Sequence, residues 1–312
     1  MTPLVSVLVP VLNAADTLPV ALASLQAQTY DNWECIIVDD GSSDDLGAVI
    51  SNVRDARIQF HRLEKNRGRG YARQYALEFA RGRYVTFLDG DDWIYPTKFR
   101  EQVDVLTAQP DIAIVSTGMA VSNQHRELVG IRNSDILSSV MDASFRRLGM
   151  PPLAFAPSMM AADLAKKTGF DASFPIAEDV DFLLRALLGK RYAVPPAPLY
   201  VYREQGSTTL SKVSPALSYC CRMFMKYFGQ HPVDCAMEIV KARGKQVIYH
   251  AAATLGLWEH VIARRSRPPT AAERQQYRDA WKTVTNIAHA VVVAVSGHRA
   301  SETNLHLDTQ LL

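Results

Sequence analysis

Three carboxylates, Asp89, Asp91 and Asp92, stand within four positions directly after the apolar run Tyr84–Leu88. Carboxylates this close repel one another, and each raises the pKa of the others unless a cation lies between them. Mg²⁺ and Mn²⁺ prefer oxygen ligands, and Mg²⁺ is commonly shared between a few carboxylates and substrate phosphates. The cluster therefore predicts a divalent metal site. An acidic loop that only caps the next helix is the alternative explanation.

Two further polar turns follow apolar runs near the start of the chain, at residues 9–13 and 39–44. In the second turn, Asp39 or Asp40 is able to accept the imide N–H of a uracil without any metal. Gly41 permits the tight turn. The alternative is a simple helix cap, because Ser42 and Asp44 are good N-cap residues.

A basic, glycine-containing segment and an acidic helix start are the remaining candidates. Residues 66–73 read Asn-Arg-Gly-Arg-Gly-Tyr-Ala-Arg, where glycine permits close backbone approach and arginine supplies charge near a nucleotide. The segment lacks the position and the third glycine of a dinucleotide fingerprint, which excludes an NAD site. Glu178, Asp179 and Asp181 open a later helix, either as dipole-complementing acids or as a general base that takes a hydroxyl proton.

The apolar patterning from residue 4 to about 116 predicts alternating strands and helices, which is typical of parallel βαβ units. Strands are expected at residues 5–9, 33–38, 58–62, 84–88 and 112–116, and helices at 17–28, 70–81 and 97–107. Ligands of open α/β sheets bind beyond the carboxyl ends of the strands. The polar clusters after the first, second and fourth strands are therefore expected at one edge of the sheet.

The later part of the chain is predicted to become helical. Periodicity weakens between residues 121 and 152 and resumes at 154–160, followed by a helix at 180–188 and an extended segment at 199–203. Beyond Pro215 we expect only helices, at 217–228, 235–260 and 271–295. Pro268 and Pro269 exclude a continuous helix between the last two.

Seven motifs in fixed order resemble the family 2 glycosyltransferases, and the resemblance covers residues 4–210. They are VSVLVPVLN, the stretch Gln26–Glu34, IIVDDGSSDD, NRGRGYARQ, YVTFLDGDDW, AEDVDFLLRAL and YVYREQGST. The resemblance implies an inverting enzyme with the GT-A fold, an α/β architecture with a Rossmann-like, mostly parallel sheet flanked by helices. It places the catalytic domain at residues 1–212 and leaves a helical C-terminal region at 213–312.

The resemblance also implies roles for individual residues. Asp179 is the catalytic base, and Asp91 is the principal ligand of a Mn²⁺ or Mg²⁺ that bridges the donor diphosphate, with Asp89 near the ribose as a second metal residue. Asp40, together with Asp39, contacts the base. The remaining donor-binding residues are Pro10, Asn13, Asn66, Gly68, Arg73, Gly90 and Arg203. Acceptor or secondary residues are Asp92, Trp93, Glu178, Asp181, Ser207 and Thr208.

One motif departs from the family pattern. After Tyr202-Arg203 many relatives carry a histidine that reaches the metal or the diphosphate, whereas this chain has Glu204-Gln205. That substitution puts the metal contact of this loop in doubt. Arg203, with the hydroxyls of Ser207 and Thr208, remains suited to clamp phosphate oxygens.

Charge and composition limit the kinds of partner that the protein is expected to bind. Residues 213–312 carry 12 Lys and Arg against 7 Asp and Glu, although the whole chain has a net charge of only +2. This basic region predicts peripheral contact with an anionic membrane surface, and a solvated helical face is the alternative. The apolar segment 287–295 is too short to span a bilayer. We expect a cytoplasmic protein at the inner face of the membrane, with no signal peptide, no nucleic-acid partner and the capacity to form homo-oligomers.

These features predict an inverting transfer of one sugar from a nucleotide sugar, with UDP favoured, to a glycan, lipid-linked or protein acceptor. The process would be cell-surface polysaccharide, lipopolysaccharide or glycoprotein synthesis. The Q-x-x-R-W motif of processive synthases is absent, which favours one sugar per encounter. A sugar-nucleotide nucleotidyltransferase and a non-catalytic binding module are the alternatives. The first lacks its phosphate loop here, since residues 10–13 read Pro-Val-Leu-Asn.

Overall fold

The computed structural model describes residues 2–132, 141–204 and 209–296. Its centre is an eight-stranded sheet in the order β3-β2-β1-β4-β10-β6-β11-β9, in which all strands except β9 and β10 run parallel. The strands are β1 (Val5–Val11), β2 (Trp33–Asp39), β3 (Ile58–Arg62), β4 (Tyr84–Phe87), β6 (Ile112–Val115), β9 (Met141–Phe145), β10 (Met159–Ala161) and β11 (Lys190–Val194).

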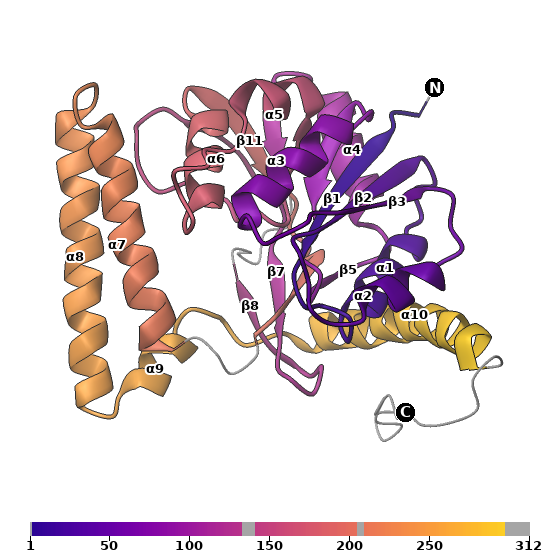
Figure 1. Cartoon of the computed structure of the whole chain (residues 1–312). Helices are drawn as coiled ribbons and strands as arrows, with labels where there is room; N and C mark the ends of the chain where they lie inside the picture. The colour runs from indigo at the N-terminus through magenta and orange to yellow at the C-terminus, as the bar shows by residue number, and fades with distance from the viewer. Residues whose placement is uncertain (1, 133–140, 205–208, 297–312) are drawn as a thin grey trace.

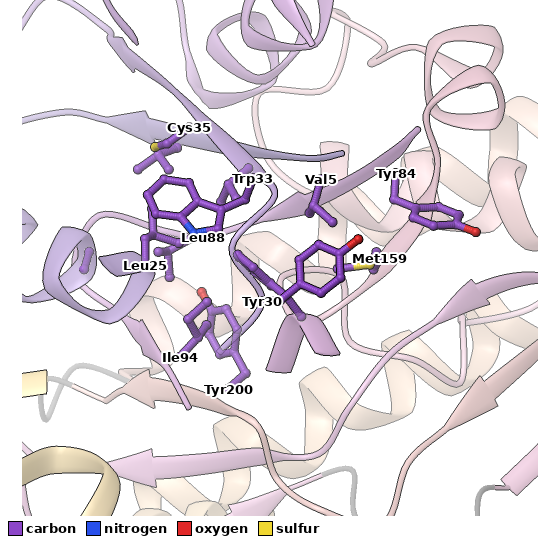
Figure 2. Packing of buried hydrophobic residues seen from close by; sticks show 14 of the residues in the cluster. Val5, Leu25, Tyr30, Trp33, Cys35, Tyr84, Leu88, Ile94, Met159 and Tyr200 are labelled. Carbon is purple, nitrogen blue, oxygen red and sulfur yellow. The ribbon is translucent and has the colours of Figure 1, made fainter. Parts of the chain in front are cut away.

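Helices cover both faces of this sheet because its strands are apolar on both sides. They are α1 (Leu18–Gln26), α2 (Leu46–Ser51), α3 (Arg69–Phe79), α4 (Lys98–Ala108), α5 (Ala162–Thr168) and α6 (Glu178–Leu187). Alternate residues of β1 point to opposite faces. Val5, Val7 and Val9 pack with α1 and α4, whereas Leu8 packs with α3, α5 and α6. Figure 2 shows the first of these clusters, including Val5 and Trp33, which pair across β1 and β2.

A second, four-stranded sheet in the order β5-β12-β7-β8 lies beyond the carboxyl edge of the first. Its strands are β5 (Trp93–Ile94), β7 (Met119–Ser122), β8 (Leu128–Arg132) and β12 (Tyr200–Arg203). Three of the strands in the region of weak periodicity, β7, β8 and β9, were not expected. All three are short. β8 and β9 are edge strands, whereas β7 pairs with both β12 and β8.

The last helix, α10 (Ala271–Ser296), folds back along α1 and under the second sheet (Figure 1). Tyr277 and Val284 of α10 join Val20 of α1 and Trp93 of β5 in one buried cluster. The ring of Trp93 lies 5.3 Å from that of Tyr277 and 5.4 Å from that of Trp281. This helix therefore contributes to the core around the second sheet.

Helices α7 (Leu210–Tyr227) and α8 (Pro232–Thr254) form an antiparallel pair beside α6, followed by the short α9 (Trp258–Ala263) (Figure 1). Helix α7 begins before Pro215, which lies at its sixth residue, so this proline does not mark the start of the helix. Helix α8 ends at Thr254, short of the expected residue 260, because Gly256 adopts a left-handed conformation with φ of 69°. Among the described residues, no helix combines the length and apolar composition needed to cross a bilayer.

The fully buried Lys98 gives the fold a specific pH dependence. Its Nζ donates to Thr86 Oγ1 at 2.9 Å and to Gln102 Oε1 at 2.8 Å, and burial lowers the pKa of Lys98 to about 7 from an ordinary value of 10.5. Between these two values the unfolded chain binds a proton that the folded chain does not. The Lys98 contribution to stability therefore rises with pH through this window.

We expect the Lys98→Met variant to lose this rise. The unfolding free energy of the wild type minus that of the variant should increase by about 2 kcal/mol between pH 7 and pH 9, since one pKa unit corresponds to about 1.4 kcal/mol. Urea unfolding at the two pH values measures the difference. Equal differences at both values would mean that Lys98 stays protonated in the folded protein.

Candidate functional site

The loops that follow β1 and β2 are tied together at the carboxyl edge of the main sheet. Asn13 Oδ1 accepts hydrogen bonds from Ser43 N at 2.9 Å and from Ser43 Oγ at 3.2 Å, and Asn13 N donates to Ser42 Oγ at 2.9 Å. Asn13 has a positive φ of 52°, a conformation that asparagine tolerates better than most residues. The partly buried Pro10 precedes this turn. The two loops thus form one surface, as expected for the ends of adjacent parallel strands.

The two adjacent acids of the second loop are used differently. Both oxygens of Asp40 accept backbone N–H groups, from Arg67 at 2.7 Å and from Gly68 at 2.8 Å. Asp40 therefore holds the basic loop against β2. In Asp39, Oδ1 accepts from Ser42 N at 2.8 Å, whereas Oδ2 is buried without a hydrogen-bond partner among the described residues. Its nearest cation is Arg62, whose Nε lies at 3.4 Å.

Arg73 links the turn after β4 to the start of α6. Its buried guanidinium donates through Nη1 to Glu178 Oε1 and through Nη2 to Asp89 Oδ1, both at 2.9 Å. The same group lies over the ring of Phe155, 4.7 Å from its centroid. Both Arg73 and Glu178 are only 1% exposed, so this ion pair is isolated from water.

In the turn after β4, Asp92 points into the protein and Asp91 stays partly exposed to solvent. Gly90 lies so close to β1 that an added Cβ would be 2.7 Å from Val11 Cγ1, which leaves room only for glycine. Asp92 is buried and accepts from Tyr200 Oη at 2.7 Å and from Arg203 N at 2.8 Å, so it fixes the turn to β12. Asp91 stays partly exposed. Burial raises the pKa of Asp91 and the nearby Asp89 charge raises it further, while Arg203 opposes both.

The N-terminus of α6 brings Glu178 and Asp179 to the same region. Asp179 is partly buried, and its Oδ1 accepts from Val180 N at 2.9 Å. The residue before them, Ala177, has a left-handed φ of 66°, which costs an alanine roughly 1–2 kcal/mol. Such strain persists only where the surrounding contacts enforce it. Here it turns the first residues of α6 toward Arg69 and Arg73.

Arg69 is the residue around which the candidate acids gather. Its Nε lies 3.0 Å from Glu178 Oε1. The charges of Glu178, Asp89, Asp179 and Asp91 all raise the pKa of Arg69, against the effect of its burial. The structure thus places the acids after β4 and the acids that open α6 in one electrostatic neighbourhood. The sequence analysis did not select Arg69, although its spacing of four residues from Arg73 places both on one face of α3.

A second cation was also missed. Arg126, in the turn between β7 and β8, lies near Asp91, Asp92 and Arg203. Burial lowers the pKa of Arg126 to about 10, and the charge of Arg203 adds to this effect. Its segment carries no recognisable motif, so only the pairing of β7 with β12 brings it to the site.

Several residues proposed from the sequence make contacts that hold the fold or its loops, and two are outside the described residues. Asp181 is buried and accepts from Arg185 Nε at 2.8 Å and from Tyr227 Oη at 2.6 Å, so it binds α6 to α7. Trp93 is fully buried beneath α10. Asn66 accepts from Gly68 N at 3.0 Å and shapes the basic loop. Ser207 and Thr208 lie outside the described residues.

Comparison with known proteins identifies the family. The model of the family described as "Glycosyl transferase family 2" matches residues 6–161, half of the chain. The UDP-Glc:α-D-GlcNAc-diphosphoundecaprenol β-1,3-glucosyltransferase WfaP of Escherichia coli is 38% identical over 106 residues, covering 34% of this chain and 42% of that protein. The succinoglycan biosynthesis protein ExoO of Rhizobium meliloti is 30% identical over 219 residues, covering 66% and 62%. The matches thus span less than two thirds of either relative.

A solved structure shows the same architecture. The crystal structure of S. aureus TarS 1–349 in complex with UDP-GlcNAc aligns with a TM-score of 0.63 and 18% identity, over 93% of this chain and 83% of that one. At this low sequence identity, the structural similarity shows only that the two proteins share a fold. The predicted GT-A architecture is confirmed. The family model, which matches half of the chain, establishes that this chain belongs to glycosyltransferase family 2.

Proposed function

We propose that this protein transfers one sugar from a UDP-sugar to an acceptor hydroxyl, with inversion at the anomeric carbon. The observation that carries the proposal is the bridge made by Arg73, which donates to Asp89 in the turn after β4 and to Glu178 at the start of α6, the two segments that also hold Asp91 and Asp179. A transferase of this kind needs a donor diphosphate site and a base on opposite sides of one carbon. Arg69 and Arg73 hold these two groups of acids at a common place.

Asp179 is the proposed base. Its carboxylate is partly exposed at the first turn of α6. It takes the proton of the acceptor hydroxyl as the oxygen attacks the anomeric carbon, on the face opposite the leaving diphosphate. The C–O bond to the acceptor forms as the bond to the diphosphate breaks, so one displacement inverts the configuration.

Asp39, rather than Asp40, is the proposed acceptor for the uracil imide. The two oxygens of Asp40 are occupied by the backbone of Arg67 and Gly68, whereas Asp39 Oδ2 has no hydrogen-bond partner among the described residues. Arg62 Nε lies 3.4 Å from this oxygen and forms an ion pair without a hydrogen bond, so an N–H donor from the ligand would supply the hydrogen bond that Oδ2 lacks. Asp40 then serves to position the backbone of Arg67 and Gly68 beside the nucleoside.

The residues present fit a hard divalent metal. Asp91 is partly exposed and its pKa is raised in part by the like charge of Asp89, a conflict that a cation relieves. Among the described residues, no three metal-binding side chains form a complete cage. Asp91, with Asp89 beside it, would therefore hold Mn²⁺ or Mg²⁺ together with donor phosphates. When bound, the metal neutralises charge on the leaving diphosphate.

The Asp91→Ala variant tests the metal assignment. We expect the affinity for UDP in the presence of Mn²⁺ to fall at least about tenfold, since a ligand of the ion is lost and each tenfold corresponds to about 1.4 kcal/mol. The unfolding free energy without ligand should stay equal or rise, because a repelled carboxylate has been removed. Titration calorimetry of UDP with and without Mn²⁺ measures the effect, with the exposed Asp16→Ala as control. Unchanged Mn²⁺-dependent affinity would place the metal elsewhere.

The relatives guide the choice of donor and acceptor. The E. coli protein is named for a UDP-Glc donor and a diphosphoundecaprenol-linked acceptor, and the Rhizobium protein for succinoglycan biosynthesis. We accordingly propose a UDP-hexose donor and a lipid-linked glycan acceptor in the assembly of a cell-surface polysaccharide.

A thermal-shift screen of nucleotide sugars, with and without Mn²⁺, tests the proposed function. A donor held at 100 times its Kd stabilises the folded protein by about 2.7 kcal/mol. We expect UDP-sugars to raise the melting temperature, and the Asp39→Asn variant to respond less to UDP but not to lose its fold. A protein that no nucleotide sugar stabilises, and that hydrolyses none of them, would not be a transferase.

The outer face of α8 is the proposed membrane contact. Val233, Val240, Val247 and Ile248 lie along this face and are 59–73% exposed, on a helix that also carries Lys241, Arg243 and Lys245. An apolar stripe flanked by cations suits an anionic lipid surface. A second copy of the chain would bring like charges together on this face. The alternative of a solvated basic face leaves these large exposed side chains unexplained.

Vesicle binding tests this contact. We expect the full chain to sediment with phosphatidylglycerol vesicles at low salt and less at high salt, as the Debye length shortens from about 8 Å. Val240→Asp combined with Val247→Asp should abolish sedimentation, whereas Val129→Asp, on the exposed face of β8, should leave it intact. No binding at low salt, or equal binding of both variants, would exclude this helix.

A further inference from the structure

A cavity of about 650 Å³ lies between the segment after β9 and the α7–α8 pair, and none of the donor-binding residues lines it. Its wall is largely apolar, with side chains from the β9 segment on one side and from the two helices on the other. These are Phe145, Leu148, Met150, Leu217, Phe224 and Met237. Cavities of this size bind small molecules or parts of larger ones.

The cavity adjoins the N-terminus of α6. Val180, which follows the proposed base, packs in one cluster with Leu148 and Phe224, and both of these residues line the cavity. The thiol of Cys220, which also lines the cavity, interacts electrostatically with two charged side chains. Burial raises the pKa of Cys220 to about 11, the charge of Asp179 raises it, and Lys245 lowers it. Both charges thus act on a residue of the cavity wall, and Lys245 itself lines the cavity.

The charged residues of the lining leave one cation in excess. Arg147 Nη2 pairs with Asp234 Oδ1 at 2.9 Å, and Lys241 Nζ pairs with Glu238 Oε1 at 2.8 Å. Lys245 also lines the cavity and is exposed, and no described carboxylate forms an ion pair with it. A lining that is apolar with one excess cation is complementary to an anionic amphiphile.

We propose that this cavity binds the acceptor, an amphipathic molecule whose anionic head contacts Lys245 and whose apolar chain lies along α8. The inference rests on the proposed transferase function and assigns its acceptor site. The accepting hydroxyl faces Asp179 at the α6 end. The chain leaves past Met237, which lines the cavity and is 40% exposed beside Val233 and Val240 on the outer face. A lipid anchor thus continues directly from the cavity into the proposed membrane contact.

Farnesyl diphosphate serves as the probe, titrated into the full chain with saturating UDP and Mn²⁺ so that the donor site is filled. We expect binding to the wild type, and at least about tenfold weaker binding to Lys245→Gln, which removes a charge-assisted hydrogen bond, and to Met150→Asp, which places a carboxylate in the apolar wall. Lys282→Gln, an exposed lysine on α10, is the matched control and should bind like the wild type. Farnesol and inorganic diphosphate should each bind more weakly than farnesyl diphosphate.

Equal affinity of Lys245→Gln, Met150→Asp and the wild type for farnesyl diphosphate would overturn the assignment, as would equally tight binding of inorganic diphosphate alone. Steady-state kinetics gives a second measurement. The acceptor KM should rise about tenfold in Lys245→Gln while the stabilisation by UDP is unchanged. A wild type that binds UDP-sugars but shows none of these differences retains the proposed function and loses this site. A wild type that neither binds nor hydrolyses UDP-sugars loses both.

Discussion

The Asp179→Asn variant is expected to transfer sugar about 10²–10⁴-fold more slowly than the wild type, because loss of a general base typically has an effect of that size. The amide is nearly isosteric with the carboxylate and still accepts a hydrogen bond from Val180 N, as Asp179 Oδ1 does at 2.9 Å. It cannot take a proton. Donor affinity should therefore change little. Single-turnover rates with a saturating donor, together with calorimetric Kd values for UDP, separate the two quantities.

Asp181→Asn is the matched control, since it stands on the same helix but its carboxylate contacts Arg185 and Tyr227. We expect that variant to lose stability and to keep its turnover per folded molecule. Near-wild-type turnover of Asp179→Asn would assign the base to another residue. Glu178 would then be the next to test, although Arg69 and Arg73 both bind its Oε1.

The Arg73→Met variant is expected to lose about 3–5 kcal/mol of unfolding free energy, because the buried Glu178 then keeps only the more exposed Arg69 to compensate its charge. Here the carboxylate left behind is Glu178, which is 1% exposed, and Asp89 loses a hydrogen bond as well. Methionine keeps much of the volume beside Phe155, so a cavity contributes little. Urea unfolding at pH 7 measures the change.

Arg147→Met provides the comparison for Arg73. Arg147 also pairs with an aspartate, but its side chain is 74% exposed, so we expect a loss of at most about 1 kcal/mol. A loss below about 1 kcal/mol in Arg73→Met would show that Arg69, which already lies 3.0 Å from Glu178 Oε1, compensates the Glu178 charge by itself. It would also mean that Arg73 acts mainly on the donor and not on the fold.

The parts of the fold that could be predicted from sequence are those governed by local patterning. β1 and β2 are continuous apolar runs, and β3 was predicted with the bounds that the structure has. Because the ends of these strands were predicted, the position of the polar turns at the carboxyl edge of the sheet could be predicted as well. Strands β7 and β9 were not predictable in the same way, since they pair with β12 and β11, which lie far along the chain, and β8 pairs only with β7.

In the candidate site, too, the sequence does not predict which atoms are already engaged in hydrogen bonds. Asp39 and Asp40 are adjacent and chemically equal, so the sequence alone does not tell which one is free to bind a ligand. The backbone of Arg67 and Gly68 decides it by occupying both oxygens of Asp40. Likewise, Trp93 follows the acidic cluster directly, yet its side chain is buried by α10. Both outcomes depend on contacts between distant segments, which local patterns do not encode.

The burial of Trp93 by α10 also bears on how the protein is made. Tyr277 and Val284 lie roughly 190 residues after Trp93, and at about 5–20 residues per second a ribosome needs some ten to forty seconds to add them. During that interval the nascent β5 exposes an uncovered indole surface that favours aggregation. Chaperones that bind apolar segments would be needed at this strand for that interval, and for longer at α1, whose Val20 packs in the same cluster. The yield of folded enzyme should then depend on the speed of translation across residues 94–284, more than on any step before it.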